Sequence, residues 1–134
     1  MWSQESGPPV VAVLNSNDDT VEMLRVMLES EGMLTVSAHL ADIKRGNFDF
    51  GGFLKEHDPK VVLVDLAPPY DRTWLMLQHL RNVPAARGRS FVLTSTNPAR
   101  VQEIANPDQE VLEIIGKPYD IRAIVDKVRE AIRT

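Results

Sequence analysis

"KVVLVDLAPPY", the stretch from Lys60 to Tyr70, decides the fold of this chain. Four apolar residues in a row, Val61 to Val64, are typical of a strand that is buried on both faces. Asp65 follows them at once, and two prolines come soon after. Strands are buried on both faces when helices cover both sides of a parallel sheet. The stretch therefore predicts a central parallel strand that ends in a carboxylate.

Four further strands are predicted around this central one. Val10 to Leu14 is another continuous apolar run, and Leu34 to Ala38 is a weaker one. Phe91 to Thr94 and Val111 to Ile115 complete the set. Helical segments separate these strands, and right-handed crossovers then favour a doubly wound, flavodoxin-like (βα)5 sandwich of the α/β class. We expect a five-stranded parallel sheet in the order 2-1-3-4-5.

Apolar residues at helical spacing predict five helices between and after the strands. The clearest is the last, whose apolar stripe is Ile121, Ile124, Val125, Val128 and Ile132. The polar turn "NSNDDT" before the first helix offers several possible caps. Asp18 and Asp19 are expected to cap the helix and complement its dipole, and Gly32 is expected to end it. Gly51 and Gly52 weaken a short second helix, and the segment from His39 to Asn47 is expected to be loop because it has little periodicity.

Length and composition limit the classes of protein that the chain can represent. The chain has 134 residues and 43% hydrophobic content, which are typical of one globular domain. We expect this domain over residues 10–134, after a flexible N-terminal tail over residues 1–9. The absence of cysteine excludes disulfides and thiolate chemistry. A net charge of -4 argues against nucleic-acid binding, and no apolar run is long enough for a membrane span. With no secretory signal at the N-terminus, we expect a cytoplasmic protein.

Polar residues follow several of the predicted strands at their carboxyl ends. Asn15 and Ser16 follow the first, Asp65 the third, Thr94 the fourth and Lys117 the fifth. In open α/β sheets these ends meet at one rim, where ligands bind. A carboxylate, a hydroxyl and an ammonium group are therefore expected to converge on one pocket.

Phosphoryl transfer to a carboxylate is the chemistry that fits this set of groups. An oxygen of Asp65 would be the nucleophile. As charge spreads over the phosphoryl oxygens, Lys117 would supply a positive charge and the Thr94 hydroxyl a hydrogen bond. A divalent metal normally supplies the remaining charge.

Three short motifs, each at the end of its own strand, carry a family resemblance. They are Asp65 with Pro69 four residues on, Thr94 followed by the small Ser95, and "KPYD" at Lys117 to Asp120. From Val10 to Ile132 the chain resembles the receiver domain of two-component response regulators.

The resemblance implies a role for each of these residues. Asp65 is then the phosphoacceptor, Lys117 contacts the phosphoryl group, and Thr94 moves to bind it. The donor is a histidine kinase or a phosphotransfer protein, and the signal passes to an unknown effector protein. Such a domain is a switch that carries out its own transfer and slow hydrolysis, and it is not a metabolic enzyme. Whether the chain forms a homodimer is left open.

The chain also departs from the family pattern at the metal site. Asn15 and Ser16 stand where the family carries the two acidic residues that hold Mg²⁺. Asp65, the Ala67 backbone carbonyl, Asn15 and Ser16 would form a weak site, because Mg²⁺ prefers carboxylate oxygens. Ile114 replaces the aromatic residue of receivers that switch by rotating a ring. A pseudo-receiver, which signals through protein contacts without phosphorylation, is therefore the alternative interpretation.

Overall fold

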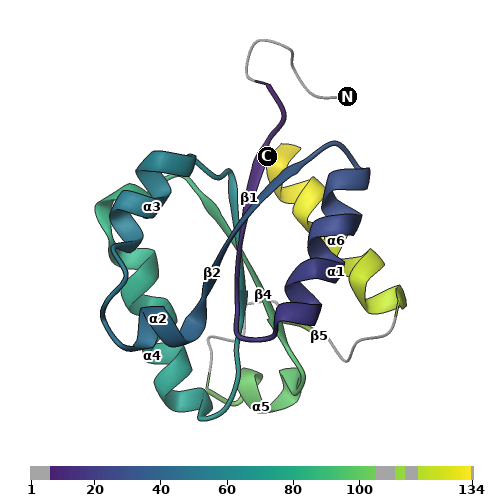
Figure 1. Cartoon of the computed structure of the whole chain (residues 1–134). Helices are drawn as coiled ribbons and strands as arrows, with labels where there is room; N and C mark the ends of the chain where they lie inside the picture. Colours follow the sequence, from purple (N-terminus) through teal and green to yellow (C-terminus); the bar gives the residue numbers. More distant parts are fainter. Residues whose placement is uncertain (1–6, 105–110, 114–117, 134) are drawn as a thin grey trace.

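The computed structural model describes residues 7–104, 111–113 and 118–133. Within them a parallel sheet lies between two layers of helices (Figure 1). The sheet has five strands in the order β2-β1-β3-β4-β5, and each neighbouring pair is parallel, which confirms the predicted fold class and strand order. The strands are β1 (Val10–Asn15), β2 (Leu34–His39), β3 (Val61–Asp65), β4 (Ser90–Ser95) and β5 (Val111–Glu113).

Helices pack on both faces of this sheet. Figure 1 shows α1 and α6 together on one side, and α2, α3 and α4 on the other. None of the described helices is long and apolar enough to cross a membrane. The helical elements are α1 (Asp18–Ser30), α2 (Leu40–Lys44), α3 (Phe50–His57), α4 (Tyr70–Asn82), the 3-10 turn η1 (Pro84–Ala86), α5 (Pro98–Gln102) and α6 (Pro118–Arg133).

Two apolar clusters, one on each face of the sheet, form the core. Because side chains alternate along a strand, β3 sends Val62 and Val64 to one cluster and Val61 and Leu63 to the other. All four are at most 2% exposed, so the apolar run is continuous because both faces need apolar residues. Helices α3 and α4 complete the first cluster, and α1 and α6 the second.

The apolar stripe predicted for the last helix is confirmed. Its five residues are each at most 9% exposed, and all lie in the cluster shared with α1. The 3.6-residue period of a helix places them on one side, and the sheet covers that side. These residues are Ile121, Ile124, Val125, Val128 and Ile132.

The loop predicted from His39 to Asn47 is wrong in part, because it contains the short helix α2. His39 caps this helix: its Nδ1 accepts a hydrogen bond from the Ala41 N–H at 3.1 Å. Leu40 is only 1% exposed and packs into the core. Five residues are too few for an apolar period to show, and histidine is not among the usual capping residues, so the sequence carried neither signal.

The capping role expected for Asp18 and Asp19 is wrong, whereas their expected place beside the helix dipole is confirmed. Asn17 is the capping residue, and its Oδ1 accepts a hydrogen bond from the Thr20 N–H at 3.0 Å. Asp18 and Asp19 lie in the first turn, where carboxylates complement the positive end of the helix dipole. Their charges support the helix without satisfying its terminal N–H groups.

Candidate functional site

Asp65 and Thr94 meet where the two central strands end. The two residues are direct partners in the parallel register of β3 and β4. The Thr94 hydroxyl donates a hydrogen bond to Asp65 Oδ1 at 2.8 Å. Thr94 is only 1% exposed, whereas Asp65 is half-buried. The carboxylate thus accepts a hydrogen bond from a buried hydroxyl and is itself partly exposed to solvent.

Burial changes the proton affinity of this carboxyl group. Loss of solvent raises the pKa of Asp65, and the hydrogen bond from Thr94 lowers it in part. A carboxylate that has lost water contacts is more basic than one in water, because burial disfavours its charged form. Asp65 is therefore a carboxyl group of raised pKa whose Oδ1 accepts a hydrogen bond from Thr94.

Asn15 lies at the same rim, one residue past the paired Leu14 and Val64 of β1 and β3. It is only 5% exposed, and its Oδ1 accepts a hydrogen bond from the Asn17 N–H at 2.8 Å. The amide oxygen is therefore used to shape the turn before α1. Ser16 is exposed on this turn.

The Ala67 carbonyl is also already engaged. The Thr73 hydroxyl, on α4, donates to the Ala67 carbonyl oxygen at 2.6 Å and lies 3.1 Å from the Pro69 carbonyl oxygen. Thr73 is only 1% exposed. This bond fixes the loop that follows Asp65 against the first turn of α4.

These oxygens do not fit a strong Mg²⁺ site. Mg²⁺ favours carboxylate ligands in nearly octahedral geometry, but Asp65 is the one carboxylate of the expected set. Of the other candidates, Asn15 and Ala67 offer oxygens that already accept short hydrogen bonds. Among the described residues, no three histidine, aspartate or glutamate side chains come together as a metal cluster.

The structure brings together part of the predicted pocket. Asp65, Thr94, Asn15 and Ala67 lie at the carboxyl ends of adjacent strands or just beyond them. Lys117, predicted to supply the positive charge, lies outside the described residues.

Thr73 is the residue that the sequence prediction missed. It stands four residues after Pro69, the residue that precedes α4. A threonine hydroxyl at this spacing can bind the backbone carbonyl one turn earlier. That spacing was the available signal, although it could not show that the hydroxyl would also reach Ala67.

Solved structures with the same arrangement were found across nearly the whole chain. A sensor protein from Polaromonas sp. is 21% identical with a TM-score of 0.66, covering 93% of this chain and 96% of that chain. A response regulator from Thermotoga maritima is 16% identical with a TM-score of 0.68, covering 95% and 99%. A CheY-like response regulator receiver domain from Methylobacillus flagellatus is 15% identical with a TM-score of 0.64, covering 94% and 99%.

The likeness is one of structure. No family model matches the sequence, and no curated protein matches it significantly. The strand order, the helix layers and the position of Asp65 at the end of β3 agree with the resemblance seen in the sequence motifs. This chain therefore has the fold of the receiver domains of response regulators.

Proposed function

We propose that this chain is a receiver domain whose signal is set by a phosphoryl group on Asp65. The observation that carries the proposal is the bond from the buried Thr94 hydroxyl to the Asp65 carboxylate at 2.8 Å. This hydroxyl is a hydrogen-bond donor beside a half-buried carboxylate at the rim where α/β sheets bind ligands. The donor would be a histidine kinase or phosphotransfer protein, and the output an effector protein, in the cytoplasm.

The transfer itself needs few steps. An Asp65 carboxylate oxygen attacks the phosphorus atom of a phosphohistidine, a P–O bond forms, and the P–N bond breaks. The imidazole leaves and takes up a proton from solvent, and an acyl phosphate remains on Asp65. Thr94 would turn its hydroxyl from the carboxylate to a phosphoryl oxygen, where negative charge gathers. Lys117 is proposed to supply the positive charge.

A pseudo-receiver remains the second candidate, for a specific reason. The Asn15 side-chain oxygen and the Ala67 carbonyl oxygen already accept hydrogen bonds within the protein. A divalent cation would therefore find few protein oxygens to take the place of its water ligands. In that case the fold would signal through protein contacts alone, and Asp65 would keep its place because it anchors Thr94.

Labelling with a small phosphodonor such as acetyl phosphate separates the two candidates. We expect the natural chain to gain the mass of a single phosphoryl group, and Asp65→Asn to gain none, because the nucleophile is lost. Asp58→Asn is the matched control, since Asp58 is exposed and lies outside the pocket. Labelling that persists in Asp65→Asn would refute the assigned phosphoacceptor.

Restoring the acidic pair tests the metal. We expect Asn15→Asp with Ser16→Asp to tighten Mg²⁺ binding and speed labelling, because hard cations prefer charged oxygens. The natural chain should need more Mg²⁺ than this variant. Without metal, the variant should unfold at a lower temperature, since three carboxylates then repel at one rim. If only the restored variant is ever labelled, even with the cognate kinase, the chain is a pseudo-receiver.

A further inference from the structure

A cavity lies between the α2–α3 segment and α4, and Pro69, from the loop that follows Asp65, is part of its lining. Its volume is about 760 Å³. Sites for small organic molecules span roughly 300–1,000 Å³ and are mostly apolar with a few polar groups. Phe48, Phe50, Met76 and Leu80 are among the apolar residues of its wall. The size and the lining therefore match those of a small-molecule site.

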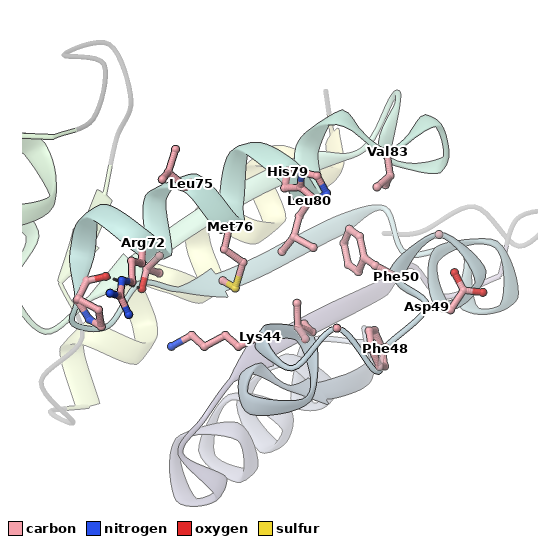
Figure 2. Close-up of a pocket in the computed structure, with 15 residues that line it drawn as sticks. Lys44, Phe48, Asp49, Phe50, Arg72, Leu75, Met76, His79, Leu80 and Val83 are labelled. Carbon is pink, nitrogen blue, oxygen red and sulfur yellow. Dashed lines mark hydrogen bonds between the residues drawn. The ribbon is translucent and has the colours of Figure 1, made fainter.

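Positive charge gathers at one end of this cavity. Figure 2 shows Lys44 reaching toward the end where Arg72 lies, whereas Phe48 and Phe50 lie toward the other end. Both cationic side chains are exposed, and among the described residues no carboxylate pairs with either. The nearby carboxylates have other partners, because Asp42 pairs with Arg45 and Asp71 accepts a hydrogen bond from the Arg72 backbone N–H. Lys44 and Arg72 lie next to the apolar part of the lining.

Asp49, the acidic residue of the lining, does not cancel this charge. Its Oδ1 accepts a hydrogen bond from the Gly52 N–H at 3.0 Å and caps α3. In Figure 2 it lies at the end of the cavity away from Lys44 and Arg72. The carboxylate thus serves the helix, and the opposite end stays positive.

We propose that this cavity binds a small amphipathic anion, with an acidic head group at Lys44 and Arg72 and an apolar body along Phe48, Phe50 and Leu80. An arginine fork binds a carboxylate or sulfonate through paired hydrogen bonds, and lysine adds a point charge. The apolar body would leave water for the aromatic wall. The proposal does not rest on phosphorylation of Asp65, so its test is separate from that of the proposed function.

Two anionic probes and one uncharged control molecule test the site on the whole chain. 8-Anilinonaphthalene-1-sulfonate reports binding by fluorescence, and dodecanoate should displace it. Dodecanol, which has the same chain length without charge, measures the apolar contribution alone. We expect saturable binding of both anions by the folded natural chain, with amide shifts in nuclear magnetic resonance spectra confined to α4 and the α2–α3 segment.

Charge variants then assign the head group. Lys44→Gln with Arg72→Gln should weaken dodecanoate binding by about tenfold or more, the effect expected for lost charge-assisted hydrogen bonds, and leave dodecanol binding unchanged. Lys55→Gln is the matched control, because Lys55 is an exposed lysine of α3 outside the lining. Circular dichroism checks that each variant is folded. Absence of saturable binding, equal dodecanoate affinity in the double variant, or shifts outside the cavity would overturn the proposal.

Discussion

At the scale of single residues, Asp65 is placed where its charge opposes folding. Burial raises its pKa above the ordinary value of about 3.8, so the folded protein holds the proton more tightly than the unfolded chain does. Proton binding by Asp65 therefore stabilises the folded protein. This stabilisation is complete below the pKa of Asp65 in the unfolded chain, and it is lost as the pH rises through the pKa in the folded protein. At neutral pH the ionised carboxylate therefore lowers the free energy of unfolding.

Asp65→Asn should reverse this effect. Without metal, we expect the variant to melt at a higher temperature than the natural chain at pH 7, because its amide carries no charge to desolvate. The difference should shrink as the pH falls toward 4, where the natural carboxyl group takes up its proton. Thermal unfolding followed by circular dichroism from pH 4 to 8 measures this, with the exposed Asp42→Asn as control. A difference that stays constant with pH would contradict the assigned cause.

The Thr94 hydroxyl can be tested in the same pocket. Thr94→Val preserves the branched shape and removes the donor, so Asp65 loses the bond of 2.8 Å. We expect a loss of about 1 kcal/mol in stability, since water can reach the half-buried carboxylate, and slower labelling by acetyl phosphate. Thr94→Ser keeps a hydroxyl and should retain labelling. Equal labelling rates in the valine and serine variants would exclude a role for the hydroxyl.

At the scale of elements, the first turn of α3 contains two adjacent glycines, Gly51 and Gly52, in different surroundings. A Cβ at Gly51 would meet the Asp49 Oδ1 at an ordinary 3.7 Å, whereas a Cβ at Gly52 would overlap the Asp49 carboxylate. Because that carboxylate caps the helix, the two positions should respond differently to alanine.

Gly51→Ala should stabilise the protein by up to about 1 kcal/mol, the difference in helix propensity. Gly52→Ala gains the same propensity, but it displaces the Asp49 cap, whose loss costs about 0.5–2 kcal/mol. Urea unfolding of the two variants gives the comparison. An equal gain at both positions would show that the Asp49 cap contributes little.

Elements with a strong apolar pattern could be predicted from the sequence, and those shaped by local hydrogen bonds could not. The run from Val61 to Val64 and the stripe of α6 follow from burial, which acts on every residue of the element. The short helix α2 depends on a histidine cap, and the choice of Asn17 over Asp18 depends on the turn conformation.

The candidate site divides in the same way. Asp65 and Thr94 could be paired in advance, because parallel strands bring their carboxyl ends together. The engagement of Asn15 and Ala67 could not, since both oxygens choose partners that only the folded loops supply. The cavity beside α4 likewise arises from segments that are distant in the sequence.

At the scale of the whole molecule, the two apolar clusters share the strands β1 and β3. Leu54 and Ile124 are fully buried on opposite faces of the sheet, in different clusters. Each face therefore supports the same backbone, and neither should unfold alone.

Leu54→Ala and Ile124→Ala should each lower the free energy of unfolding by about 2–5 kcal/mol, because each leaves a cavity. The double variant should show nearly the sum, since the two residues share no contacts in the core. Circular dichroism and tryptophan fluorescence should report one coincident transition. Separate transitions would indicate that the two faces unfold independently.

Thr73 connects the loop after Asp65 with the cavity beside α4. It holds the loop after Asp65, through the Ala67 carbonyl, and the same residue lines the cavity beside α4. If an anion in the cavity shifts Thr73 and the loop that it holds, the free energy of phosphorylating Asp65 changes. Thermodynamic linkage then requires the reverse, so that phosphorylation would change the affinity for the anion by the same factor. The protein would then respond to two inputs, the proposed anion in the cavity and the proposed phosphoryl group on Asp65.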